Sequence, residues 1–231
     1  MVETGDKMRR KLLVYLTSLI LVITFVAPLQ TQAVIDRPDF DRDHEVAKEF
    51  GDNRAIELID RLNKDEREIL ENKIKDNEMF ESINTDLRLY QAQHHTVDQS
   101  ARNIDSLFQK AEKTPAMRFV YLYKDAEQLG MFENKDIIND TSINMANFGT
   151  LRESLEYGIH SDFIAGDLVR NNIRSDQNIV LKLKVPADTR ILYTGESQVV
   201  LERNQGIKIT NWRLAAEGGR QVILADAEIV S

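Results

Sequence analysis

The sequence contains no cysteine, which excludes disulfide bonds and thiolate metal sites. Histidine is also scarce: His44, His94, His95 and His160 are the only four, and none lies in an HExxH pattern, so no metal site is predicted. The ten glycines form neither a GxxxxGK phosphate loop nor a GxSxG turn. P-loop nucleotide hydrolysis, zinc catalysis and serine hydrolysis of the α/β type therefore have no support.

Positive charge is in deficit, with 30 lysines and arginines against 38 acidic residues and a net charge of −8. Such an acidic chain argues against wrapping of nucleic acid and against docking on anionic lipid. The chain of 231 residues is 42% hydrophobic and has only four prolines, which suffices for one sizeable core.

The N-terminus has the pattern of a secretory signal peptide. Arg9, Arg10 and Lys11 form a positive region, Leu12–Ala27 is apolar, and Thr31–Ala33 offers a small-residue cleavage site. The apolar run is shorter than the roughly 20 residues that cross a bilayer. We therefore predict that residues 1–33 are removed and that the protein is secreted and extracellular, with no membrane contact afterwards; an uncleaved anchor is the alternative.

The next segments predict a leader followed by helices. Residues 34–43 are polar, include Pro38 and are expected to form a flexible leader. Residues 44–81 have apolar positions near the 3.6-residue period and are expected to be helical, with Asn63 and Glu66 forming a capping box. Two more helices are expected in 82–111, joined near 94–99, and Leu151–Gly158 is expected to be helical.

Alternating and β-branched segments later in the chain predict a sheet. The expected strands are 118–123, 159–163, 178–185, 191–193, 198–202, 206–214 and 220–229. The predicted fold class is α+β, with a helical N-terminal part packed on a mixed β-sheet core.

Motifs in the C-terminal half resemble a known family. The strand ending LKVP at Pro186, the Tyr193-Thr-Gly segment and VVLERNQG at 199–206 resemble the last part of the ADP-ribosyltransferase exoenzyme fold. ADTR at 187–190, LERN at 201–204 and DAEIV at 226–230 are more similar still to the family of the anthrax lethal factor middle domain, a degenerate and inactive relative. The resemblance runs from about Ser82 to the C-terminus, which predicts an ADP-ribosyltransferase-like domain at 82–231.

The resemblance implies a three-part site, and the first part is altered here. In the family, an arginine on the first strand grips the dinucleotide phosphates after a tyrosine. Tyr121 matches that tyrosine, and Leu122 stands in the place of the arginine. Lys124 has the same strand parity as Leu122 but lacks the bidentate geometry of a guanidinium.

The other two parts of the family site are altered as well. The Ser-Thr-Ser segment that orders the nicotinamide pocket corresponds to Ser161, Asp162 and Phe163, so one serine survives. The family's pair of glutamates falls on Glu196 and Gln198, and the catalytic one is therefore glutamine. Glutamine keeps the hydrogen-bonding capacity of glutamate but not the charge that stabilises a developing cation.

These changes predict a pseudoenzyme that acts as a protein-binding or peptide-binding module of a toxin-related virulence protein, with no cofactor. The resemblance to the lethal factor domain implies an extended peptide as partner, such as a host kinase-kinase tail. Residues that could contact it are Tyr121, Tyr123, Lys124 and Trp212.

Two alternatives remain open at this point. One is an active NAD-dependent ADP-ribosyltransferase that uses Lys124 and an acid such as Glu196 or Glu202. The other is a decoy or regulatory partner of a related toxin.

Overall fold

The computed structural model describes residues 37–93, 97–124, 137–139, 141–154, 157–172 and 177–230. The predicted signal peptide and the pair His94–His95 lie outside these residues. Within the described ranges, no helix is both long enough and apolar enough to cross a membrane.

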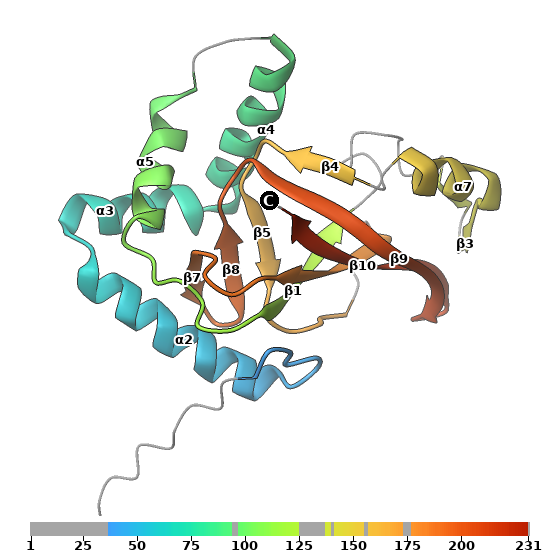
Figure 1. Cartoon of the computed structure of the whole chain (residues 1–231), viewed down its shortest axis with the longest axis horizontal. Helices are drawn as coiled ribbons and strands as arrows, with labels where there is room; N and C mark the ends of the chain where they lie inside the picture. The colour runs from blue at the N-terminus through green and yellow to red at the C-terminus, as the bar shows by residue number, and fades with distance from the viewer. Residues whose placement is uncertain are drawn as a thin grey trace, which may run out of the picture. The chain divides into compact units, whose positions relative to one another are not determined.

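A mixed sheet forms the centre of the fold, with the strand order β4-β9-β10-β6-β1-β5-β8-β7 (Figure 1). Its strands are β1 (Arg118–Lys124), β4 (Tyr157–His160), β5 (Ile164–Asp167), β6 (Ile179–Val185), β7 (Ile191–Gly195), β8 (Gln198–Leu201), β9 (Gln205–Glu217) and β10 (Arg220–Val230). The β6–β10 pair is parallel and the other pairs are antiparallel. The α+β class predicted from the sequence is confirmed.

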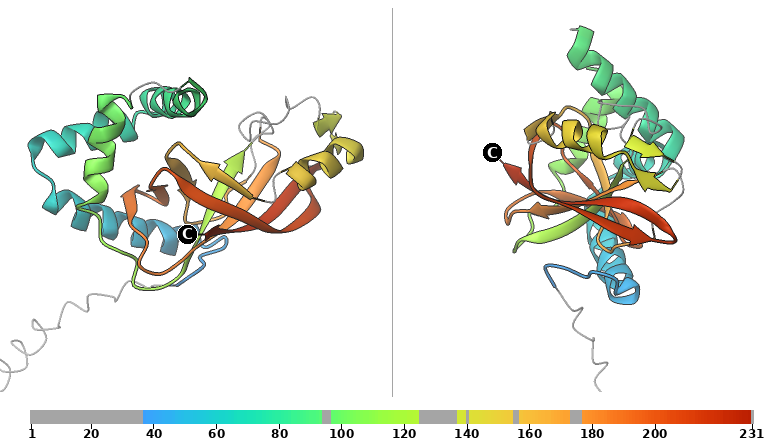
Figure 2. Two further views of the ribbon diagram at one scale, coloured as in Figure 1. Left: turned by 45° about the horizontal axis from the view of Figure 1, so that its top comes forward. Right: turned by 90° about the vertical axis from the view of Figure 1, so that its right-hand side faces the viewer.

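Helices lie on two sides of this sheet. Those before the first strand are α2 (His44–Arg61), α3 (Lys64–Ile69), the π-helical turn η1 (Leu70–Ile74), α4 (Asn77–Gln93) and α5 (Gln99–Phe108). They group beside β7 and β8 in both figures, whereas α7 (Met145–Ser154) lies near the β9–β10 hairpin with the short strands β2 (Ile138–Asn139) and β3 (Ser142–Ile143) (Figures 1 and 2).

Side-chain caps fix where two of these helices begin. Asp43 caps α2 by accepting a hydrogen bond from the backbone N–H of Val46. Asn63 and Glu66 form the predicted capping box of α3, with reciprocal bonds of 2.9 and 2.8 Å. The predicted capping box is confirmed. It could be predicted because both of its residues lie in one short stretch of the sequence.

One hydrophobic cluster joins the helices to the sheet. Leu70, Phe80, Ile104 and Phe108 are buried in it together with Phe163, which comes from the segment before β5. The rings of Phe108 and Phe163 stack with centroids 6.0 Å apart. The helices therefore share a core with β7, β8 and the segment that precedes β5.

The strand predicted at 159–163 is wrong in its extent. Tyr157–His160 pairs with β9, and a separate strand, β5, begins at Ile164. Phe163 lies between them because the side chain of Asn84 satisfies its backbone: the Asn84 amide donates to Phe163 O at 3.1 Å, and Phe163 N–H donates to Asn84 Oδ1 at 3.0 Å. The predicted helix 151–158 is also too long, since α7 ends at Ser154.

Residues 37–43, predicted to belong to a flexible leader, are packed against the sheet. Phe40 is 1% exposed, and Phe119 N–H donates to Pro38 O at 2.8 Å. Asp39 accepts hydrogen bonds from Tyr121 Oη at 2.8 Å and from Lys182. The prediction of a flexible leader is wrong for these residues, because Phe40, an apolar side chain in a polar segment, is buried in the core.

The predicted boundary between residues 81 and 82 falls inside α4, which runs unbroken from Asn77 to Gln93.

Candidate binding groove

A groove of about 420 Å³ opens between α4 and the neighbouring strands β1, β5 and β8. Its wall on the helical side carries Phe80, Glu81, Asn84 and Arg88 of α4. The rest of the described lining comes from Ile74, Asn77, Tyr123, Lys124, Asp162, Phe163, Ala165, Gly166, Asp167, Gln177, Thr194, Gln198, Val199 and Val200.

The groove brings together part of the residue set predicted from the sequence. Tyr123, Lys124, Asp162, Phe163 and Gln198 line it. The other predicted positions, Tyr121, Leu122, Ser161, Glu196 and Trp212, are not part of this lining.

Leu122 lies in the core instead of the groove, with 1% of its surface exposed. It packs under β5, where a Cβ added at Gly166 would lie only 2.6 Å from Leu122 Cδ2 and 2.6 Å from Val120 Cγ1. Glycine at position 166 is thus required by this close approach. Position 122 therefore contributes an apolar side chain to the core and no cation to the groove.

Tyr121 and Trp212 each pack elsewhere. The Tyr121 hydroxyl bonds to Asp39 in the packed N-terminal segment. The Trp212 ring meets Phe148 of α7 edge-on, with centroids 5.9 Å apart. Trp212 therefore joins α7 to the β9–β10 hairpin, and its predicted contact with a partner stays a prediction.

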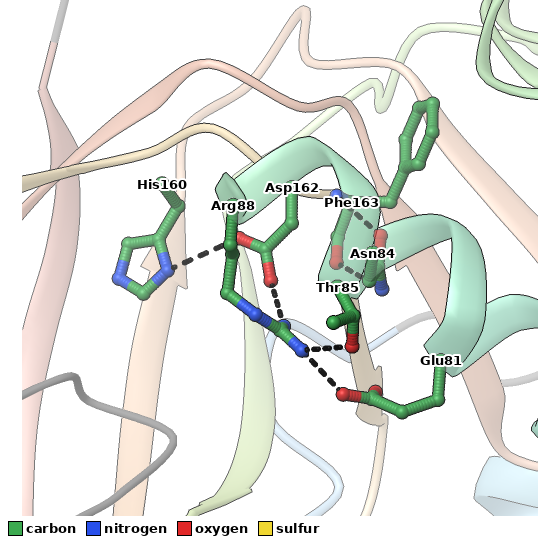
Figure 3. Close-up of polar contacts among 7 residues, drawn as sticks. All are labelled: Glu81, Asn84, Thr85, Arg88, His160, Asp162 and Phe163. Carbon is green, nitrogen blue, oxygen red and sulfur yellow. Dashed lines mark hydrogen bonds and ion pairs between the residues drawn. The ribbon is translucent and has the colours of Figure 1, made fainter. Parts of the chain in front are cut away.

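Arg88 is the centre of a polar network at one end of the groove (Figure 3). Its guanidinium donates to Asp162 Oδ2 at 2.6 Å, to Thr85 Oγ1 at 3.0 Å and to Glu81. His160 Nδ1 lies 3.8 Å from the other carboxylate oxygen of Asp162. One guanidinium is thus shared by two carboxylates.

This network holds both partners in their charged forms. Burial opposes ionisation of Asp162, but His160, Lys124 and Arg88 outweigh it and keep the pKa of that carboxyl below its ordinary value. Burial likewise opposes the charge on Arg88, yet its bonds to Glu81 and Asp162 raise the pKa of the guanidinium. The Asp162–Arg88 ion pair is therefore intact at neutral pH.

Asp167 and Gln198 lie at the other end, where β5 pairs with β8 and these two residues are direct partners across the strands. Ser197 Oγ donates to Asp167 Oδ1 at 3.3 Å, and Thr194 Oγ1 donates to the backbone oxygen of Gln198 at 3.3 Å. The position that the resemblance assigns to the catalytic glutamate thus faces the groove as a neutral amide.

Glu196 occupies the tight turn between β7 and β8, with a positive φ of 54°. Its backbone N–H donates to Asp52 Oδ1 of α2 at 2.6 Å. A Cβ added at Gly51 would lie 2.0 Å from the carbonyl oxygen of Glu196, so helix and turn are in close contact. The turn places Glu196 against α2, outside the groove lining.

Sequence reasoning missed Asn84, Arg88 and Asp167. Asn84 and Arg88 are four residues apart on α4, next to the buried positions Ile83 and Leu87. Polar residues at helical spacing beside an apolar stripe were a usable signal. The sequence around Asp167 gave no such signal, because Asp167 lines the groove only through the pairing of β5 with β8. Across the described residues, no group of three or more His, Cys, Asp or Glu side chains could hold a metal ion.

Comparisons with known proteins agree with this fold. A family model of the ADP-ribosyltransferase exoenzymes matches residues 47–231. Lethal factor of Bacillus anthracis is 23% identical over 154 residues, which are 64% of this chain and 18% of that protein. The chain therefore spans less than a fifth of that relative.

Two solved structures illustrate the similarity. Plx2a, an ADP-ribosyltransferase toxin from Paenibacillus larvae, superposes with a TM-score of 0.74 at 20% identity, covering 84% of this chain and all of that one. The Clostridium limosum C3 exoenzyme gives 0.71 at 21% identity, covering 86% and 100%. At such identities the structures establish the fold alone. Together with the family model and lethal factor, they confirm the resemblance inferred from the motifs.

Proposed function

The chain belongs to the ADP-ribosyltransferase exoenzyme family, and on that premise we propose that it is a secreted, toxin-related protein whose transferase-like domain is catalytically inactive. Its groove then serves to bind an extended segment of another protein. Secretion follows from the predicted signal peptide at 1–33, and it is part of the same proposal.

The observation that carries the proposal is the pairing of Arg88 with Asp162 and Glu81. A dinucleotide brings a pyrophosphate, and its recognition depends on cations free to form charge-assisted hydrogen bonds. Arg88 is the only arginine among the described lining residues, and carboxylates of the chain itself occupy its fork. An incoming phosphate would have to displace them.

Two neighbouring positions support the same conclusion. Leu122 is buried under β5 and supplies no cation. Gln198 faces the groove without the negative charge that stabilises an oxocarbenium-like transition state. On this proposal, Leu122 leaves phosphate binding without its cation, and Gln198 leaves the transition state without its stabilising negative charge.

An active NAD-dependent transferase is the second candidate, and one observation favours it. Lys124 and Asp167 both line the groove, so it holds a cation and an acid in addition to Gln198. Glu196, one of the two acids that the sequence suggested for that role, lies on the turn against α2. In this alternative, Asp167 would take the place of the missing glutamate.

The experiment that separates the two candidates measures nicotinamide release from NAD by the purified protein, with an active exoenzyme of the family as positive control. We expect no release above the uncatalysed rate. Release that disappears in both Lys124→Ala and Asp167→Asn, with the fold of each variant intact by circular dichroism, would establish the active enzyme and overturn the proposal.

A further inference from the structure

The charged side chains that line the groove are engaged within the protein. Arg88 is held by the carboxylates of Glu81 and Asp162. Lys124 acts on Asp162 through its charge, and Asp167 accepts a hydrogen bond from a neighbouring hydroxyl. Lys124 and Asp167 also have further interactions in the chain, so neither is without a partner. A ligand therefore meets no charge in the described lining that lacks a partner.

Three carboxamide side chains in the lining differ from these charged groups. They belong to Asn77 in the first turn of α4, to Gln177 just before β6 and to Gln198 at the start of β8. None of the three side chains has a hydrogen bond with another of the described residues. Because they come from three separate elements, they offer hydrogen-bonding groups on different sides of the groove.

We infer that the groove binds the main chain of an extended and uncharged protein segment, through the carboxamides of Asn77, Gln177 and Gln198. This inference rests on the proposed function, since it names the chemistry of the segment that the groove would hold. The side chains of the segment then need only be small and neutral, because its peptide groups supply the recognition.

Asn84, which lines the same groove, already binds a main chain in this way (Figure 3). Its NH₂ group donates to Phe163 O at 3.1 Å, and its oxygen accepts a hydrogen bond from Phe163 N–H at 3.0 Å. One carboxamide thus satisfies both the donor and the acceptor of a single residue. The other three carboxamides can hold a second main chain by the same chemistry.

The chemistry of these groups selects for peptide units and against charge. A carboxamide has an acceptor oxygen and two N–H donors, which match the C=O and N–H of a peptide unit. A charged side chain of the ligand would lose part of its hydration in the groove, where the opposite charges of the described lining already have partners. Charge on the segment would therefore weaken its binding.

The dimensions of the groove suit a short extended segment. The wall formed by α4 runs about 16 Å from Asn77 to Arg88, at a rise of about 1.5 Å per residue. An extended chain covers that length with about five residues. Ala165, which is exposed, and Gly166 also line the groove, and their small size leaves a main chain room to approach.

A titration of the ¹⁵N-labelled protein with four pentapeptides tests the inference. The parent peptide is acetyl-Gly-Ala-Ala-Ala-Gly-amide. In its ester analogue, lactic acid replaces each alanine, so that the central N–H donors are lost with little change in shape. The other two peptides carry lysine or glutamate in place of the central alanine.

We expect the parent peptide to shift the side-chain NH₂ signals of Asn77, Gln177 and Gln198. The ester analogue should bind at least about fivefold more weakly, because each lost hydrogen bond between neutral groups weakens binding severalfold. The lysine and glutamate peptides should bind no more tightly than the parent.

Variants separate the carboxamide from the surrounding surface. Gln198→Met keeps the length and neutrality of the side chain but removes its hydrogen-bonding groups, and the exposed position should tolerate the change. It should weaken binding of the parent peptide about threefold and reduce the difference between the parent and its ester. Gln109→Met, an equal change at an exposed position outside the groove lining, should leave both unchanged.

Each outcome bears on one claim. Equal binding of the parent and its ester, or tighter binding of either charged peptide, would overturn the inference and leave the proposed function standing. Shifts confined to residues outside the groove, the absence of any shift, or parent binding that Gln198→Met leaves unchanged would also overturn the inference. Nicotinamide release from NAD would instead overturn the proposed function itself.

Discussion

At the scale of single residues, the groove depends on two side chains of α4 that hold the segment before β5. Asn84 bonds twice to the backbone of Phe163, and Arg88 bonds to Asp162. Each of these two side chains bonds to a residue that is far from it in the sequence. These contacts fix the position of Asp162. Asp162 in turn binds Arg88, which is the only arginine among the described lining residues of the groove.

Replacing Asn84 by alanine should lower the free energy of unfolding by about 2–3 kcal/mol, because the buried N–H and C=O of Phe163 lose their partners. Urea denaturation at pH 7 measures the change. Asn53→Ala is the matched control: the Asn53 amide donates to Glu49 O on the exposed side of α2, and its loss should change stability by less than about 0.5 kcal/mol. Equal losses in both variants would contradict the role given to Asn84.

Asp162 should also shape the acid stability of the protein. Its pKa is lowered in the folded state, so its ion pair stabilises the fold above the unfolded pKa near 3.9 and ceases to do so as pH falls through the folded pKa. Asp162→Asn should therefore be less stable than the wild type at pH 7, and the difference should shrink toward pH 3.

Unfolding free energies of the wild type, Asp162→Asn and the exposed Asp60→Asn, measured between pH 7 and pH 3, check this expectation. A difference between wild type and Asp162→Asn that stays constant with pH would show that the carboxylate contributes no charge-dependent stability.

At the scale of elements, the contact between α2 and the β7–β8 turn fixes one end of the groove. Gly51 lets the helix approach the carbonyl of Glu196, and Asp52 accepts the N–H of the same residue. Thr194 and Gln198 flank this turn and line the groove. The position of α2 therefore determines where the end of the groove that Thr194 and Gln198 line is located.

Gly51→Ala should destabilise the protein by about 1–3 kcal/mol, because the new methyl group would lie 2.0 Å from a backbone oxygen. Gly149→Ala in α7 is the matched control, since nothing lies within 4 Å of its added Cβ. There the gain in helix propensity should leave stability unchanged or raise it by up to about 1 kcal/mol. Thermal unfolding of both variants decides the matter, and a neutral Gly51→Ala would refute the close contact.

The packed N-terminal segment 37–43 is a second such element. Phe40 lies between Phe50 and Arg118, with ring and guanidinium centres 5.3 and 5.8 Å away. Phe40→Ala should cost about 3–4 kcal/mol of unfolding free energy, measured by urea denaturation. A loss below about 1 kcal/mol would mean that the segment is dispensable to the fold.

At the scale of the whole molecule, the sequence predicted what is encoded locally. Alternating apolar residues located the strands from Ile179 onward, and the Asn63–Glu66 pair located the start of α3. The motifs around 183–206 led to the family that the comparison also finds.

Long-range partners explain what the sequence did not predict. The segment Ser161–Phe163 is held by Asn84 and Arg88, whose contribution no local pattern near 161 contains. The packing of Phe40 depends on Phe50 and on β1. The site was predicted only in part because its residues come together from α4, β1, β5 and β8.

The measurement that tests the central claim most directly is a calorimetric titration of the purified protein with NAD. Occupation of Arg88 by Asp162 and Glu81 predicts no saturable binding up to millimolar concentrations. Saturable binding with a Kd below about 100 μM, equivalent to more than about 5 kcal/mol of binding free energy, would contradict the account and return the groove to the family's dinucleotide chemistry.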